Sequence, residues 1–155
     1  DKIKMMIIGS GYKKNILKKY VKLNNLDKIV KLVDYKKNPY SHISSSDCLI
    51  LSSKYEGSPN VLLEAGILKK LIISSNCQTG PKQITSNGKG GYLFKVGDYK
   101  KLAKIIDNLN FNKKETKNKI YFSYKLVKRY SKLNQKKEFM FALKKLEKDS
   151  KDEKK

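Results

Sequence analysis

Residues 48–75 read CLILSSKYEGSPNVLLEAGILKKLIISS, and two kinds of pattern alternate within them. A compact apolar run at residues 48–52 leads into a polar turn that contains Gly57 and Pro59. A segment with helical character follows, and a second apolar run occupies residues 71–75. Compact apolar runs suit strands that are buried on both faces, and a helix between two of them is typical of a parallel sheet with crossover connections. The stretch therefore predicts an α/β fold.

The same alternation extends outward from this stretch over the first two-thirds of the chain. Three more apolar runs predict strands at residues 3–8, 29–33 and 92–96. Helical spacing places two sets of apolar side chains each on one helix face, namely Ile16, Leu17, Tyr20 and Val21, and Leu102, Ile105, Ile106 and Leu109. We therefore expect a Rossmann-like parallel sheet with flanking helices.

The length and the change of pattern after the fifth strand define the expected domains. A chain of 155 residues is long enough for one domain with a single core. We assign residues 1–110 to the Rossmann-like domain and residues 111–155 to a lysine-rich helical extension that ends in a charged tail. Apolar residues recur in that extension at helical spacing, at Phe139, Leu143 and Leu146. Its aromatic residues Tyr121, Phe122 and Tyr124 are expected to pack and not to stack on nucleic-acid bases.

The net charge of +22 raises the question of a polyanionic partner. Arg129 is the only arginine, whereas recognition of bases and phosphates favours the guanidinium group, and the lysines are spread along the chain. We therefore expect no specific nucleic-acid partner. Contact with an anionic membrane remains a prediction, because lysine-rich surfaces are attracted to anionic headgroups.

The location of the protein is predicted from its termini and cysteines. The chain opens with charged residues, and no run approaches the roughly 20 apolar residues that cross a bilayer. Cys48 and Cys77 show neither a disulfide framework nor a metal-ligand spacing. These features favour the reducing cytoplasm, with the inner face of the plasma membrane as a further expectation.

Two acidic residues stand out, because Glu56 and Glu64 are the only ones between Asp47 and Asp98. Glu56 follows a predicted strand and so lies at the carboxyl edge of the sheet, where open α/β folds bind ligands. Ser58 is expected to cap the next helix, with Pro59 at its first position and Glu64 in its second turn.

This arrangement suits a ligand that carries phosphates and hydroxyl groups. A helix N-terminus offers free amides to a diphosphate, and carboxylates accept hydrogen bonds from vicinal hydroxyls of a ribose or a sugar. The spacing alone fits equally well with Glu64 supporting its helix and Glu56 being a solvated loop residue.

The stretch SSKYEGSPNVLLEA at residues 52–65 resembles the paired-glutamate motif of the retaining GT-B glycosyltransferases, a family that includes many bacterial polysaccharide and glycan-assembly enzymes. Similarity extends over roughly residues 3–109. It includes IIGSG at residues 7–11, the loop CQTGPKQI at residues 77–84, and the turn NGKGGYLF at residues 87–94. The resemblance implies that this chain is the donor-binding C-terminal half of a GT-B fold.

The resemblance also implies a reaction and its partners. A sugar would pass from a nucleotide sugar, expected to be UDP-linked, to a glycan or lipid-linked acceptor with retention, and without a cofactor or an essential metal ion. Glu56, the implied catalytic residue, would hold hydroxyls of the donor sugar, and Glu64 would hold those of the ribose. The remaining implied donor-site residues are Gly9, Gly11, Gly57, Ser58, Asn60 and Val61.

Three departures from the family pattern bear on these roles. Asp34 stands where a glycine is common near the base, and Gln83 stands where a glutamate is common. The family's arginine and lysine at the diphosphate, together with its N-terminal acceptor domain, would precede this chain, so we expect the isolated chain to be inactive. The alternative hypothesis is a non-catalytic basic module that binds nucleotide, anionic membrane or nucleic acid.

Two further residues are given minor roles. His42, the only histidine, is expected in a short helix as a surface or packing residue. Cys77 lies on a loop that could face the site, although a structural role is favoured because nothing obvious lowers its pKa.

Overall fold

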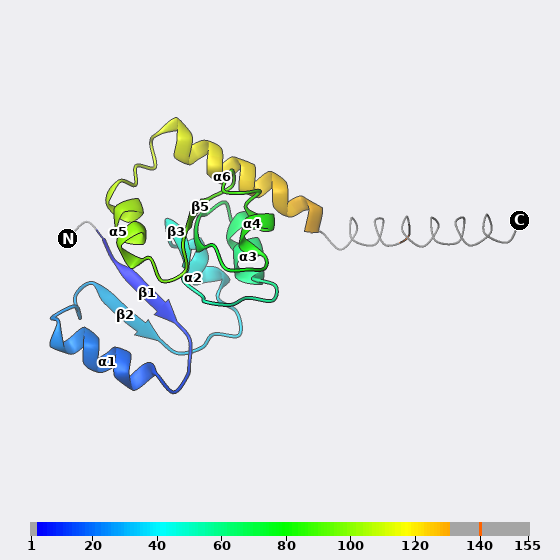
Figure 1. The fold of residues 1–155 in the computed structure, drawn as a ribbon. Coiled ribbons are helices and arrows are strands. Elements are labelled where there is room, and N and C mark those ends of the chain that lie inside the picture. The colour runs from blue at the N-terminus through cyan, green and yellow to red at the C-terminus, as the bar shows by residue number, and fades with distance from the viewer. Residues whose placement is uncertain (1–2, 131–139, 141–155) are drawn as a thin grey trace, which may run out of the picture. The chain divides into compact units, whose positions relative to one another are not determined.

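The structure, a computed structural model, describes residues 3–130 and Met140 (Figure 1). The chain divides into two compact units, with unit 1 ending at Pro39 and unit 2 beginning at Tyr40. The predicted helical pattern at Phe139, Leu143 and Leu146 and the charged tail lie outside the described residues. Within residues 3–130, no helix combines the length and the apolar composition that crossing a membrane requires.

Unit 1 is a β-α-β element. Strands β1 (Met5–Ile8) and β2 (Val30–Val33) pair in parallel, with Met5 opposite Val30, and helix α1 (Lys14–Leu23) connects them. On the helix face predicted to be buried, only Val21 is buried, whereas Ile16 and Tyr20 are 61% and 60% exposed.

Unit 2 contains a three-stranded parallel sheet in the order β3-β4-β5. The strands are β3 (Cys48–Leu51), β4 (Leu71–Ser75) and β5 (Tyr92–Phe94), and every residue of the central strand β4 is buried. The helices are α2 (Tyr40–Ser44), α3 (Asn60–Ile67), α4 (Pro81–Ile84), α5 (Tyr99–Asp107) and α6 (Lys114–Val127), and a 3₁₀ helix, η1 (Lys128–Tyr130), follows α6.

The core of unit 2 lies on both faces of this sheet. Ile72 points to one face and packs with Leu62 and Ala65 of α3, and Ile43 of α2 and Ile84 of α4 join the same cluster. Its strand neighbours point to the other face, because side chains alternate along a strand. Leu71 and Ile73 pack there with Phe94 and with partly buried residues of α5, Leu102, Ile105 and Ile106. Full burial of each large side chain contributes about 1.5–3 kcal/mol.

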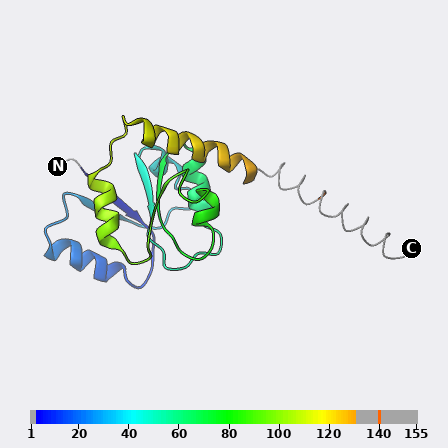
Figure 2. The ribbon, with the colours of Figure 1, turned by 45° about the horizontal axis from the view of Figure 1, so that its top comes forward.

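Helix α6 packs closely on α3 and runs along the outer side of unit 2 in both ribbon views (Figures 1 and 2). A glycine makes the close approach possible, because a Cβ atom at Gly66 would lie 2.6 Å from Cγ1 of Val127 and 2.9 Å from Oγ of Ser123. Cα of Ser123 would lie 3.1 Å from a Cβ atom at Gly90. The inner face of α6 therefore lies against two glycines, Gly66 and Gly90, which both contact Ser123.

All five predicted strands are present, with 71–75 bounded as predicted and the others shorter. Their hydrogen bonds form a two-stranded sheet in unit 1 and a three-stranded sheet in unit 2, where one parallel sheet was expected. Apolar runs identify strands, but they do not specify which strands pair.

Candidate functional site

The site begins in the loop between β3 and α3, which carries the sequence SSKYEGSP at residues 52–59. The loop is joined to the end of β4, because the Ser75 hydroxyl donates a hydrogen bond to the Ser53 carbonyl over 2.6 Å. Gly57 and Ser58 are exposed, whereas Pro59 is buried. The loop thus has a fixed base and an exposed tip at the carboxyl end of the sheet.

Helix α3 starts one residue later than predicted. Asn60 is its first residue, Pro59 occupies the cap position, and no side chain caps the helix. The Ser58 hydroxyl contacts Oδ1 of Asn60 at 3.4 Å, and the Asn60 amide donates to the Ser58 carbonyl at 2.8 Å. The predicted N-cap role of Ser58 is therefore wrong, because the Asn60 amide is already engaged by the Ser58 backbone. Glu64 still lies in the second turn.

A close contact joins this loop to the one after β4. Gly80 adopts a φ of 95°, which side chains other than glycine rarely adopt, and a Cβ atom there would lie 2.3 Å from Cδ of Pro59. The Gly80 amide donates to Oε1 of Gln83 over 3.2 Å. Gln83, which replaces the glutamate common in the family, therefore still supplies a side-chain oxygen to this turn.

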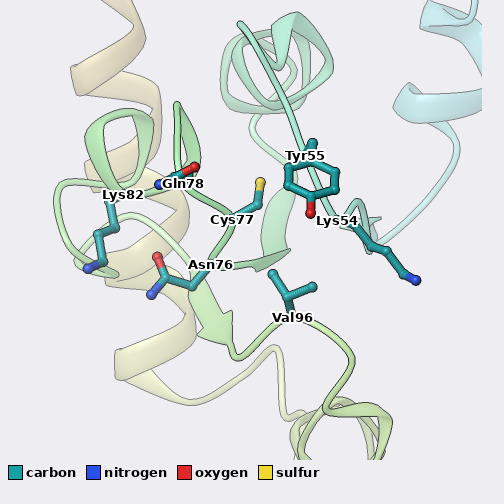
Figure 3. Close-up of a pocket in the computed structure, with 7 residues that line it drawn as sticks. All are labelled: Lys54, Tyr55, Asn76, Cys77, Gln78, Lys82 and Val96. Carbon is teal, nitrogen blue, oxygen red and sulfur yellow. The ribbon is translucent and has the colours of Figure 1, made fainter.

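A pocket of about 480 Å³ lies at the carboxyl edge of the three-stranded sheet (Figure 3). Its lining comes from all three strand ends and from α4, through Lys54, Tyr55, Asn76, Cys77, Gln78, Lys82 and Val96. This is the edge at which open parallel sheets bind their ligands. Lys54 and Lys82 lie on opposite sides of the pocket in the close-up (Figure 3).

The lining residues are suited to an anion that also carries hydroxyl groups. Two lysines and two amide side chains line the pocket, and its lining includes no carboxylate. Within the described residues, Oδ1 of Asn76 is buried without a hydrogen-bond partner. Cys77 is 4% exposed and forms part of the wall. Lys54 and Tyr55 belong to the stretch at residues 52–65 and Cys77, Gln78 and Lys82 to the loop at residues 77–84, both of which the sequence had singled out, whereas Asn76 lies in neither.

Neither Glu56 nor Glu64 is part of the pocket lining. Glu56 directly follows Tyr55, which lines the pocket, and Glu64 lies on α3. Both glutamates are half-buried. Among the other predicted donor-site residues of unit 2, Gly57, Ser58 and Asn60 are exposed and Val61 is half-buried.

Gly9 and Gly11 belong to unit 1, in the turn from β1 to α1. The Gly9 amide donates to the Val33 carbonyl over 3.0 Å, and the Gly11 carbonyl accepts from the Lys14 amide over 3.0 Å. In the same unit the ammonium group of Lys14 hydrogen-bonds the Asp34 carboxylate, and this bond lowers the pKa of Asp34 below its ordinary value of 3.8. No pattern in the sequence predicts this pair.

His42 lies in the short helix α2, as predicted, and is half-buried. Burial, followed by the nearby charge of Asp47, raises the pKa of the Cys48 thiol. In the part of the chain that the structure describes, no group of three or more His, Cys, Asp or Glu side chains could hold a metal ion.

With this geometry in place, comparison with known proteins assigns the chain to a family. The family model described as "Glycosyl transferases group 1" matches residues 1–126, so the chain belongs to that family. An uncharacterized glycosyltransferase of Methanocaldococcus jannaschii is 40% identical over 81 residues, which are 52% of this chain and 20% of that protein. The UDP-Gal:alpha-D-GlcNAc-diphosphoundecaprenol alpha-1,3-galactosyltransferase of Escherichia coli is 30% identical over 135 residues, covering 83% of this chain and 35% of the relative.

Solved structures show the same fold. The crystal structure of TarM has a TM-score of 0.78 at 23% identity, covering 90% of this chain and 28% of TarM. Anabaena HepE in complex with UDP-glucose has a TM-score of 0.78 at 17% identity, covering 91% of this chain and 41% of HepE. These similarities confirm the predicted Rossmann-like, GT-B-type arrangement of parallel strands and flanking helices with a helical C-terminal end. The chain spans about a fifth to a third of the curated relatives described above.

Proposed function

We propose that this chain is the donor-binding part of a retaining glycosyltransferase that takes its sugar from a UDP-linked donor. The observation that carries the proposal is the pocket at the carboxyl edge of β3, β4 and β5, formed next to the glutamate-bearing loop in a chain of this family. A UDP donor is supported by the name of the E. coli relative and by the HepE complex with UDP-glucose. A lipid-linked glycan acceptor is supported by the diphosphoundecaprenol substrates named for two relatives.

The proposal gives each residue a chemical task. Glu56 accepts hydrogen bonds from hydroxyls of the donor sugar, and Glu64 accepts those of the ribose. Amides of Gly57, Ser58 and Val61 face the diphosphate, whereas that of Asn60 is already engaged. Gly9 and Gly11 of unit 1 keep the donor-site role that the family resemblance implies for them.

Charge on the departing diphosphate is the main catalytic problem that the site has to solve. The bond between the anomeric carbon and the diphosphate oxygen breaks, a bond to the acceptor oxygen forms on the same face of the sugar, and the proton of the acceptor hydroxyl passes to the departing diphosphate. We assign the stabilisation of this charge to Lys54 and Lys82, which line the pocket, because positive charge near the departing diphosphate lowers the barrier. A missing charge-stabilising group typically costs about 3 kcal/mol, or at least a hundredfold in rate.

Transfer also needs the acceptor to be held about 3 Å from the anomeric carbon in a closed site. The chain spans about a fifth to a third of its curated relatives, and the family resemblance places acceptor binding in an N-terminal domain. We therefore expect the isolated chain to bind UDP weakly and to transfer no sugar. Product formation by these residues alone would contradict this part of the proposal.

The decisive experiment compares UDP with 2′-deoxy-UDP by calorimetry, in the native chain and in Glu64→Ala. If Glu64 holds the ribose, the native chain prefers UDP by about tenfold or more, since hydrogen bonds to charged groups contribute about 1.5–3 kcal/mol. The preference disappears in Glu64→Ala. Asp107→Ala is the matched control, because Asp107 is an exposed carboxylate at the end of α5 and should leave the preference unchanged.

The same experiment distinguishes the proposal from a non-catalytic basic module. A surface that attracts UDP by charge alone would bind it more tightly after Glu64→Ala, because a negative charge is removed, and would not distinguish the two nucleotides. Tighter binding without ribose preference would therefore refute the donor-site assignment.

A further inference from the structure

The outer face of helix α6 carries a regular row of basic and aromatic side chains. Lys114, Lys117, Tyr121 and Lys125 of α6 and Lys128, the first residue of η1, follow one another at intervals of three or four residues and are all exposed; they are here called the lysine–tyrosine stripe. Residues at these intervals share one helix face. The stripe therefore forms one continuous surface, about 20 Å long over a helix of 14 residues.

This surface is held outward by the packing of the opposite face. Thr116, Ser123, Leu126 and Val127 are buried, and Ser123 and Val127 lie close against Gly66, so the opposite face of α6 is turned outward. In both ribbon views α6 lies on the outer side of α3 and α4 (Figures 1 and 2). The packing of α6 within unit 2 therefore sets the outward orientation of the stripe.

The charge of the stripe is entirely positive. Glu115, the only acid of α6, is outside the stripe and accepts a hydrogen bond from the Tyr92 hydroxyl over 3.2 Å. Another cation, Lys119, is turned inward, where its ammonium donates to the Gly88 carbonyl over 2.8 Å. The cations that remain on the stripe therefore have no acidic residue of α6 among them.

Tyrosine rings accompany these cations. The ammonium of Lys125 lies 4.6 Å from the centre of the Tyr121 ring, and those of Lys69 and Lys128 lie 4.9 Å and 5.2 Å from the Tyr124 ring. Tyr121 is nevertheless 58% exposed. Tyrosine is favoured where one end of a side chain is in an apolar medium and the other is hydrated, as at a membrane surface.

We propose that the lysine–tyrosine stripe of α6 is a docking surface for membranes that contain anionic lipids. The ammonium groups would contact headgroup phosphates, and the ring of Tyr121 would enter the interfacial region. Lysine is a compact point charge that suits phosphates without selecting a base, which favours lipid headgroups over nucleic acid. This inference does not rest on the proposed donor site.

The test is co-sedimentation of the chain with vesicles of phosphatidylcholine alone, or with phosphatidylglycerol as about a third of the lipid. Binding should require the anionic lipid and weaken with salt. Each lysine near an anionic surface contributes about fivefold, so the double variant Lys117→Ala/Lys125→Ala should bind about thirtyfold more weakly. Tyr121→Ser should also weaken binding although it leaves the net charge unchanged.

The matched control removes the same charge from another exposed helix of unit 2. Lys100→Ala/Lys104→Ala on α5 should change vesicle binding by less than about threefold. Equal losses in the two double variants, equal binding to neutral vesicles, or binding to a short single-stranded RNA but not to vesicles would overturn the proposal. UDP calorimetry on Lys117→Ala/Lys125→Ala should match the native chain, so failure of the donor site and failure of the membrane surface can be told apart.

Discussion

Substitution of Gly80 by alanine tests the contact that joins the two loops of the candidate site. Gly80 precedes α4 with a φ of 95°, and its missing Cβ atom would lie 2.3 Å from Cδ and 2.7 Å from Cγ of Pro59. The Pro59 side chain is buried and closed into a rigid ring, so it cannot rotate away from the added Cβ atom as a flexible side chain would. Relief of the overlap must therefore move the loop that carries Glu56 or the turn that leads into α4, and both segments supply residues to the pocket.

Two destabilising effects, backbone strain and steric overlap, add in Gly80→Ala. Alanine variants of other glycines in unit 2 separate the two effects. Alanine at a positive φ costs about 1–2 kcal/mol, and overpacking costs about 1–3 kcal/mol. Alanine also lowers the entropy of the unfolded chain, which returns about 0.4–1 kcal/mol. We expect Gly80→Ala to lower the free energy of unfolding by about 3 kcal/mol.

The controls are Gly97→Ala and Gly57→Ala. Gly97 has a φ of 80° but no atom within 4 Å of its would-be Cβ atom, so its variant reports backbone strain alone, about 1 kcal/mol. A Cβ atom at Gly57 meets nothing within 4 Å, and its variant should lie within about 0.5 kcal/mol of the native chain.

The assay is guanidinium chloride unfolding followed by circular dichroism, since the chain has no tryptophan. UDP binding of each variant is measured in parallel, and Gly80→Ala should bind more weakly because the loop next to the pocket is displaced. A Gly80→Ala variant as stable as Gly97→Ala would show that Pro59 yields freely and would refute the argument.

Three further predictions concern other contacts. Gly66→Ala should destabilise unit 2 by about 2 kcal/mol through its overlap with Val127, and thermal unfolding of Gly66→Ala/Val127→Ala should show partial recovery relative to the summed single effects. The hydrogen bond from Lys14 holds the pKa of Asp34 in the folded chain below its ordinary value of 3.8. The stabilisation that this pair contributes is therefore fully present above pH 3.8 and is lost as the pH falls through the pKa of Asp34 in the folded chain. An NMR titration of the Asp34 carboxyl group with a midpoint at or above 3.8 would contradict this. Burial and then Asp47 raise the pKa of Cys48 above 9.0, so alkylation at pH 8 should be slower than for a free cysteine and faster in Asp47→Asn than in the native chain.

The sequence by itself determined the strands and the chemical class of the chain. The compact apolar runs are local, and a strand such as β4 is buried on both faces wherever it lies in the sheet, so residues 71–75 were predicted with their observed bounds. The paired-glutamate stretch is likewise contiguous, and the match of residues 1–126 to a glycosyltransferase family agrees with the resemblance that it carries. The roles of Glu56 and Glu64 remain predictions.

Only the tertiary structure decided which residues share the site. The pocket combines side chains from three strand ends, among them Tyr55, Gln78 and Val96, and no periodicity relates positions so far apart in the chain. The N-cap of α3 is Pro59 and not Ser58, because the Asn60 amide donates its hydrogen bond to the backbone carbonyl of Ser58. The N-cap preference of serine cannot predict this backbone hydrogen bond. The contact of Gly80 with Pro59 depends on where two separate loops meet. Local pattern fixes which element a segment forms, whereas contacts between segments are fixed by the packing of the whole unit.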